Sequence, residues 1–243
     1  MGTAAVPPTW PDVGSLQREQ EEVGSLDPPP WAPPDRPLVA AAAFVAFARG
    51  EAGPGAEGDR AWVGAAVVAE DGRPLRTAVV RGRAGGPYRP GLLAHREGRM
   101  TVEALATVID GGPAVDVLVL DATGRDHPRR CGLAVHLGWL LDLPSVGVTH
   151  RLLTRRDAPV PRCAGRGPSE VVHGPEGPVA RWVCTRVGAR PVVAHAGWRT
   201  DPDVAAQVVL RTSARARTPE PLRRARELAR VARAVAGAGR PTG

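Results

Sequence analysis

Residues 117–120 (VLVL) form a run in which every side chain is apolar, and Asp121 follows at once. A strand without polar positions is typical of a parallel sheet that helices cover on both faces. A helix predicted from Pro128, a residue type favoured at the first helical position, to Leu141 comes next, followed by a second apolar strand over 144–149. Because neighbouring parallel strands need such a crossover, this order predicts an α/β fold.

Further strands and helices are predicted on both sides of this unit. Residues 37–50 are an apolar run that fits a buried strand or a helix, and the two phenylalanines favour the strand. A hairpin with a central Asp-Gly turn is predicted over 60–82, and apolar residues at helical spacing follow over 96–112. Residues 155–178 are rich in Pro, Gly and Arg and carry no predicted element. Two paired strands and then two helices are predicted over 179–187, 190–197, 201–214 and 219–235.

Three antiparallel strands followed by strand–helix–strand alternation predict a mixed sheet flanked by helices, in an order compatible with a ribonuclease H-like core. We expect this domain over 36–235. A proline-rich segment, 1–35, precedes it, and residues 11–24 within that segment predict a short solvated helix. A flexible tail is expected over 236–243.

The chain is strongly basic, with a formal net charge of +7 and 32 basic residues, all of them arginine. This charge permits a polyanion such as nucleic acid as a partner. The absence of lysine, together with abundant alanine, glycine and proline, is also what a GC-rich genome produces. Charge alone therefore does not establish nucleic-acid binding.

The three cysteines, Cys131, Cys163 and Cys184, are odd in number and follow no paired spacing. This argues against a disulfide scaffold or a zinc site and predicts buried thiols in a reducing cytoplasm. No basic segment followed by an apolar stretch opens the chain, and the longest apolar run, 38–48, is much shorter than the roughly 20 residues of a membrane helix. We therefore expect a soluble cytoplasmic protein without a membrane partner.

Three side chains are candidates for chemistry. Asp121 ends a buried strand, at the edge of an α/β sheet where ligands collect, and is a candidate ligand of Mg²⁺; a turn or helix-capping role is the alternative. His127 lies in the loop that leaves Asp121 and can reach the same edge, although a capping or solvent-facing histidine is equally compatible. Glu97 stands at the start of a predicted helix, where the helix dipole favours a glutamate without any other role.

Tyr88, the only tyrosine of the chain, stands in a turn with Pro87, Pro90 and Gly91. Proline fixes its own φ and holds the preceding Arg89 extended, so the turn is stiff. A rigid turn that carries an aromatic ring suits a wedge that stacks on or displaces a nucleobase. The alternative is a tyrosine that packs on the domain surface.

The chain resembles the endonuclease V family in three segments: PYRPGLLAHREG (87–98), LVLDATGRDHPRRCGLAVHLGWLLDLPSVGVTH (118–150) and RTPEPLRRA (217–225). Enzymes of that family depend on Mg²⁺ and cut nucleic acid near deaminated adenine, that is, inosine. The resemblance covers about residues 36–235 and implies a ribonuclease H-like fold, in agreement with the predicted strand order. It also implies DNA or RNA with deaminated bases as the partner of this chain, which we expect to be a monomer.

The resemblance implies roles for single residues. Glu97 and Asp121 match metal-binding carboxylates, and His127 matches the motif histidine, so these three are catalytic candidates. The family's turn is a wedge that fills the gap left when the lesion base rotates out of the duplex, and a glycine lets the backbone approach that base. The residues that match the wedge and this glycine are Pro87, Tyr88, Pro90, Gly91 and Gly124.

The chain departs from the family where hydrolysis would depend on it most. Phe44 stands at the place of the first metal-binding aspartate, and His150, a fourth catalytic candidate, replaces the catalytic lysine. A phenyl ring has no oxygen donor, and an imidazole with an ordinary pKa of about 6.5 is largely uncharged at neutral pH. Loss of part of a metal site predicts a loss of about a thousandfold in rate. Further departures within motifs are Ala122, His95 and Trp198.

Two arrangements would restore a metal site. His95 and Glu97 are two residues apart and share a face if their segment is extended. With the other catalytic candidates they would form an imidazole-rich site suited to Mn²⁺ rather than Mg²⁺. Alternatively, Glu51 or Asp59 in the loop after Phe44 supplies the missing oxygen.

We therefore predict a protein that recognises deaminated bases (inosine) in nucleic acid, with phosphodiester cleavage weakened or lost. The alternative is an active metal-dependent endonuclease that cuts 3′ to deoxyinosine through a rearranged metal site. A third alternative is a relative that keeps the fold and has an unrelated binding role.

Overall fold

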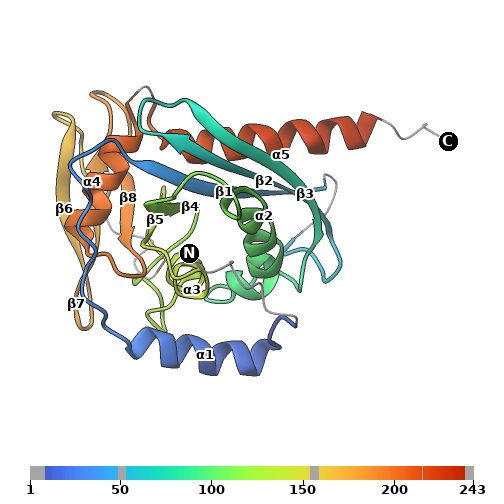
Figure 1. Ribbon diagram of the computed structural model, residues 1–243. Coiled ribbons are helices and arrows are strands. Elements are labelled where there is room, and N and C mark those ends of the chain that lie inside the picture. The colour runs from blue at the N-terminus through green and yellow to red at the C-terminus, as the bar shows by residue number, and fades with distance from the viewer. Residues whose placement is uncertain (1–8, 49–52, 154–158, 215, 239–243) are drawn as a thin grey trace.

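A sheet of eight strands forms the centre of the computed structural model, which describes residues 9–48, 53–153, 159–214 and 216–238 (Figure 1). The strand order is β3-β2-β1-β4-β5-β8-β7-β6. The strands are β1 (Val39–Phe47), β2 (Arg60–Ala69), β3 (Pro74–Arg83), β4 (Val117–Leu120), β5 (Ser145–Thr149), β6 (Gly167–Gly174), β7 (Gly177–Cys184) and β8 (Val192–Ala196). The helical segments are α1 (Val13–Ser25), the π-helical η1 (Ala94–Gly98), α2 (Arg99–Ile109), α3 (Leu133–Leu140), α4 (Pro202–Thr212) and α5 (Glu220–Ala238).

The pairing makes the sheet mixed, which confirms the predicted α/β architecture. β1, β4 and β5 run parallel to one another, whereas β2, β3, β8, β7 and β6 each pair antiparallel with their neighbours. The predicted hairpin is formed by β2 and β3, and β1 lies within the apolar run over 37–50, so the described part of that run contains a strand, as its phenylalanines indicated.

Helices cover both faces of the sheet, which explains why β4 has no polar position. Leu118 and Leu120 join the core cluster on the side of α2 and α3, while Val117 and Val119 join the cluster on the side of α4 and α5. Successive residues of a strand point to opposite faces, so a strand between two helix layers is apolar throughout. Among the described residues, none of the helices has the length and apolar character needed to cross a membrane.

α5 lies across one face of the sheet, over β1 and β2, on the side of the molecule opposite α1 (Figure 1). The contact is close at Gly64 of β2, where an added Cβ would lie 2.2 Å from the carbonyl oxygen of Ala225. Only glycine permits this approach of the helix backbone to the strand. The register of α5 fixed in this way brings its Arg226 over Phe44 of β1.

The N-terminal helix α1 is less solvated than the sequence predicts, because one side of it is buried. Leu16 and Val23 are fully covered, and Gln20 Nε2 donates to the Cys131 carbonyl at 3.1 Å. Arg125 donates to the carbonyls of Gly24 and Leu26 at the end of the helix, each at 2.9 Å. α1 therefore supports the loop that joins β4 to α3.

A disulfide joins Cys163 to Cys184, so the prediction of three free thiols is wrong. Cys184 ends β7 and pairs with Gly167, the first residue of β6, so the turn of the chain before β6 brings Cys163 to it. β6 itself lies in the stretch 155–178, for which the sequence predicted no element, because β7 supplies its hydrogen bonds. Cys131 is the free, buried cysteine of the described residues.

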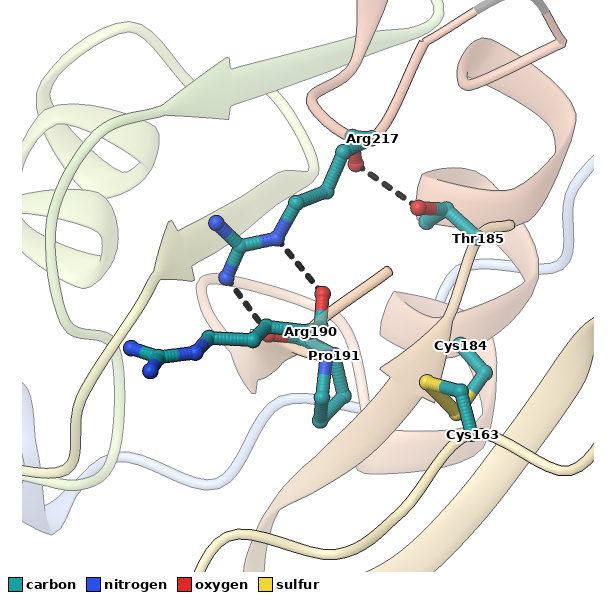
Figure 2. The surroundings of a disulfide bond; sticks show 6 residues. All are labelled: Cys163, Cys184, Thr185, Arg190, Pro191 and Arg217. Carbon is teal, nitrogen blue, oxygen red and sulfur yellow. Dashed lines mark hydrogen bonds between the residues drawn. A yellow bond between two sulfur atoms is a disulfide. The ribbon is translucent and has the colours of Figure 1, made fainter. Parts of the chain in front are cut away.

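The segment before α5 is fixed close to this disulfide. Figure 2 shows Arg217 reaching the Arg190 and Pro191 carbonyls, with Nε and Nη2 donating at 2.6 and 2.8 Å. Thr185 Oγ1, next to Cys184, donates to the Arg217 carbonyl at 2.9 Å. These contacts hold the start of α5 against the loop between β7 and β8.

The predicted start of α3 at Pro128 is also wrong, since the helix begins at Leu133. Residues 121–132 instead form a loop that folds back on itself. Within it, Gly132 N donates to Gly124 O at 3.0 Å, and Ala134 N of α3 donates to Thr123 O at 3.2 Å. The loop thereby stays at the edge of the sheet where β4 ends.

Candidate functional site

The carboxyl ends of β1, β4 and β5 meet at one edge of the sheet, where the candidate residues gather. Ala41 of β1 lies beside Leu118 of β4. Continuing this register by three residues along both strands brings Phe44 level with Asp121. The side chain of Phe44 therefore occupies the neighbourhood in which a second carboxylate beside Asp121 would stand.

A guanidinium group lies at this edge, between Asp121 and Phe44. Arg226 Nη2 donates to Asp121 Oδ2 at 3.0 Å, and the two side chains are 23% and 33% exposed. The guanidinium carbon of Arg226 is 4.9 Å from the centroid of the Phe44 ring, and that of Arg230 is 5.8 Å from it. Cations at this range are attracted by the face of an aromatic ring. The aromatic substitution and the two arginines thus form one packed unit.

Glu97 lies in η1 and lines a cavity of about 280 Å³ together with Phe44, Tyr88 and Asp121. Burial raises the pKa of Glu97 to about 7, the charge of Arg96 opposes this rise, and the charge of Asp121 adds to it. Near neutral pH the Glu97 carboxyl is therefore protonated in about half of the molecules. The two carboxylates predicted as metal ligands do share one cavity.

The turn that carries Tyr88 is held from the loop after β4. The carbonyl of Gly91 accepts a hydrogen bond from His127 Nε2 at 3.1 Å and one from Arg129 Nη2 at 2.7 Å. His127 Nδ1 accepts from the Arg129 backbone N–H at 3.2 Å, so the ring is neutral with its proton on Nε2. Burial lowers the pKa of His127 to about 4, which keeps it neutral. These contacts position the turn, whose Tyr88 side chain is exposed.

A second cavity, of about 380 Å³, lies beside the first, and Tyr88 and Asp121 border both. Its wall also includes residues of β5 and of the following loop that sequence reasoning did not single out: Thr149, Arg151, Leu152 and Leu153. A cavity of this size lies near the lower end of the about 300–1,000 Å³ of small-molecule sites.

A buried histidine stands behind Thr149. His195 Nε2 and Thr149 Oγ1 are 2.8 Å apart, and burial lowers the pKa of His195 to about 4. The sequence offered no signal for this role, since His195 follows no spacing typical of a site. It fixes the hydroxyl of Thr149 at the cavity wall.

Gly124 packs so closely against β8 that no side chain fits at this position. A Cβ there would lie 1.9 Å from the carbonyl oxygen of Ala196 in β8, and Arg125 N donates to that same carbonyl at 2.7 Å. Glycine lets the loop lie directly against β8.

His95 and His150, the other histidines of the predicted imidazole-rich site, do not complete a metal site. His95 lies in a helical turn rather than an extended segment, so it does not share a face with Glu97, and its ring lies against Gly86. His150 is exposed; partial burial and then the charges of Arg217 and Arg226 lower its pKa, while Asp121 opposes them. The predicted imidazole-rich arrangement of His95 with Glu97 is wrong.

At this edge a divalent metal ion would have to rest on Glu97 and Asp121 alone. Within the parts of the chain that the structure describes, no three His, Cys, Asp or Glu side chains converge in a way that could hold a metal. Asp59, one proposed substitute donor, is paired with Arg96 at 2.9 Å, and Glu51 lies outside the described residues. A cation beside Asp121 would also face the positive charge of Arg226.

Comparison with known proteins gives consistent matches. The profile of the family named Endonuclease V matches residues 51–227. Endonuclease V of Thermus thermophilus is 40% identical over 151 residues, which are 61% of this chain and 65% of that protein, so the matched part spans slightly less than two thirds of that relative. Endonuclease V of Streptomyces avermitilis has a similar structure, with a TM-score of 0.76, 30% identity and coverage of 97% of this chain and 100% of that one.

Another solved structure is of Ciona intestinalis endonuclease V in complex with a DNA that contains an inosine followed by a ribo-adenosine. It has a TM-score of 0.75 and 18% identity over 92% of this chain and 98% of that one. At this identity the likeness concerns the fold alone. The ribonuclease H-like arrangement predicted from the strand order is confirmed.

Proposed function

Because the chain belongs to the endonuclease V family, we propose that it recognises deaminated bases, inosine above all, in DNA or RNA, and that cleavage of the strand is weakened or lost. Endonuclease V proteins are generally metal-dependent. The observation that carries the proposal is the Arg226–Asp121 ion pair beside Phe44, at the edge where metal-dependent hydrolysis would need carboxylates.

The geometry of the Tyr88 turn and of the neighbouring cavity supports base recognition. Tyr88 is 42% exposed at the tip of a turn that two side chains hold through Gly91. The 380 Å³ cavity opens beside it and is bordered by loop backbone and by Thr149. An exposed ring next to a cavity suits a base that leaves the stack while the ring fills its place. The inosine-containing DNA bound by the Ciona intestinalis relative supports inosine as the ligand.

A second function, an active endonuclease that cuts 3′ to deoxyinosine, draws on a different observation. Glu97 and Asp121, the two carboxylates that the family resemblance marks as metal ligands, line the same cavity. Mn²⁺ or Mg²⁺ held by these two alone would have to displace Arg226 from Asp121. This candidate therefore requires cleavage that depends on high metal concentration and on Asp121.

One experiment separates the two functions. The protein is incubated with a deoxyinosine duplex and a deoxyinosine single strand, in Mg²⁺ and in Mn²⁺, and both strand nicking and the gel shift are measured. We expect a shift that prefers deoxyinosine over the matched deoxyadenosine oligonucleotide, without nicking. Nicking that the Asp121→Ala variant abolishes would establish the endonuclease instead, and equal shifts for both oligonucleotides would refute base recognition.

The role of Tyr88 is tested with a matched pair of variants. Tyr88→Ala removes the ring, whereas Tyr88→Phe keeps it and loses only the hydroxyl. We expect the preference for deoxyinosine to fall in the first variant and to persist in the second, because stacking needs the ring alone.

A further inference from the structure

The arginines of α5 give the sheet edge beside Asp121 a positive character. Arg226, Arg230 and Arg233 are spaced at i, i+4 and i+7 and so lie along one side of the helix. Arg230 and Arg233 border an open groove of about 600 Å³ that follows the end of β1. Phe44 borders both this groove and the 280 Å³ cavity, so the groove continues toward Asp121.

Arg226 keeps donors that its ion pair does not use. A guanidinium has five N–H donors in a planar fork, and Nη2 is the group that reaches Asp121. The Nε of Arg226 is buried and has no hydrogen-bond partner among the described residues. Because this Nε is not accessible, a phosphate would meet the terminal N–H groups of the guanidinium, whose side chain is 23% exposed.

Because the opposing negative charge is small, the edge attracts anions. Asp121 is the carboxylate paired with Arg226, and the Glu97 carboxyl shares the cavity from its buried position in η1. Arg230 is exposed and contacts the face of Phe44. Phe44 offers no lone pair to a metal, yet it supports both guanidinium groups through its ring.

We propose that Arg226 and Arg230 bind a phosphate of the nucleic-acid strand directly, so that binding needs no divalent metal ion. This inference rests on the proposed function in that it takes nucleic acid as the ligand. The guanidinium groups stand where Phe44 and the Asp121 ion pair leave no site for a metal. The phosphate contact is independent of which base is recognised.

The test measures the affinity for a fluorescently labelled deoxyinosine oligonucleotide in EDTA, in Mg²⁺ and in Mn²⁺ at constant ionic strength. We expect dissociation constants that agree within about twofold across the three buffers. Arg226→Ala should weaken binding about tenfold and lower the slope of log Kd against log salt by about 0.7–0.9, as expected for one lost phosphate contact. Arg226→Lys should retain the slope and recover part of the affinity, since it keeps the charge without the fork.

Arg224→Ala is the matched control. It removes the same charge from the same helix, but at about 100° per residue Arg224 points about 160° away from Arg226, and it pairs with Glu227 at 3.2 Å. We expect its affinity to stay within about twofold of the unchanged protein. Arg230→Ala, on the exposed side of the groove, is a second test that does not remove the partner of Asp121.

Titration with Mn²⁺ in the absence of nucleic acid, followed by the EPR signal of the free ion, gives an independent readout. We expect no stoichiometric site that Asp121→Ala removes; such a site would overturn the inference. Binding that EDTA abolishes, or equal losses for the Arg226 and Arg224 variants, would overturn it as well. If the deoxyadenosine control binds equally in a metal-independent, Arg226-dependent way, base recognition fails and the phosphate site stands. No binding of either oligonucleotide refutes both.

Discussion

Replacing Glu97 with glutamine should stabilise the protein at alkaline pH. The Glu97 carboxyl lies in the cavity beside Phe44 and Asp121, and its pKa is raised from 4.5 to about 7, mainly by burial. Glutamine has the same shape without the charge. The variant therefore avoids the cost of an ionised carboxylate in this cavity.

The sign and size of the effect follow from proton linkage. Between pH 4.5 and about 7 the folded state binds more protons at Glu97 than the unfolded state, so the stability contributed by this group falls as pH rises. The difference between about 7 and 4.5 corresponds to about 3 kcal/mol, at about 1.4 kcal/mol per pH unit. Glu97 retains some accessible surface, so solvent screening reduces this effect. We therefore expect Glu97→Gln to raise the free energy of unfolding by about 1–3 kcal/mol at pH 8 and by little at pH 4.5.

Two buried histidines act in the opposite direction and must be separated from this effect. The pKa values of His127 and His195 are lowered to about 4, so their contribution to stability rises with pH between about 4 and 6.5. Both proteins contain these histidines, so their contribution cancels in the difference between the variant and the unchanged chain.

The assay is urea denaturation of both proteins at pH 5 and pH 8. The control is Glu103→Gln, which removes the same charge from a carboxylate of α2 that lies outside the cavity and pairs with Arg99 at 2.9 Å. A Glu97→Gln variant that is less stable at pH 8, or whose effect does not change with pH, would refute the raised pKa of Glu97.

Three more changes test the fold and the site. Gly124→Ala should destabilise the protein by at least 1–3 kcal/mol in urea denaturation, because a Cβ 1.9 Å from Ala196 O forces the loop away from β8; a neutral change would contradict the packing of the loop. Cys163→Ser opens a bridge between residues 21 apart and should cost about 3 kcal/mol without altering nucleic-acid affinity. An unchanged urea midpoint would show that the bridge does not form in solution. Tyr88→Ala should leave the melting temperature within a few degrees, since the ring is 42% exposed; a large loss would make it a structural residue.

Local patterns were sufficient for the centre of the sheet. The all-apolar run of β4 predicts a strand covered on both faces, and alternate residues do enter the two core clusters. The Asp-Gly turn predicts the hairpin of β2 and β3 because the turn chemistry is contained in two residues. Where one short segment determines the structure, the prediction is confirmed.

Contacts between distant segments were not predictable in the same way. The disulfide depends on the pairing of β6 with β7, and β6 is made of residues that have little preference for a strand. The loop of 121–132 takes the place of the first turns predicted for α3, because its hydrogen bonds go to its own backbone, to Ala196 and to α1. A sequence pattern contains no information about such partners.

Trp198, which the family resemblance marks as a departure from the motif, packs against the N-terminal helix α1. It is buried in a cluster with Val23 of α1, Cys131 and Val135. A large apolar side chain at this position therefore fills the space under the N-terminal helix. Packing therefore accounts for a tryptophan at this position.

The sequence motifs led to Glu97, Asp121 and Tyr88, which line one cavity, but they did not lead to the arginine that pairs with Asp121. The family resemblance led us to expect a missing donor at Phe44, but nothing in the sequence places Arg226 beside Asp121, 105 residues earlier in the chain. The proximity of Arg226 to Asp121 depends on the position of α5, and the contact of the α5 backbone with Gly64 sets that position. The role of the arginine is thus a product of tertiary packing.

A guanidinium and a divalent ion differ in a way that separates binding from hydrolysis at this edge. Both attract a phosphate, and the planar fork of arginine holds one with well-defined geometry. A metal ion also binds water and lowers its pKa, whereas an arginine remains protonated and generates no nucleophile. Arg226 can therefore replace the electrostatic attraction of a metal for the strand without replacing its chemistry. On the proposed function, Arg226 beside Phe44 would keep affinity for the strand without supplying the means of cutting it, and Tyr88 would stay exposed beside the cavity.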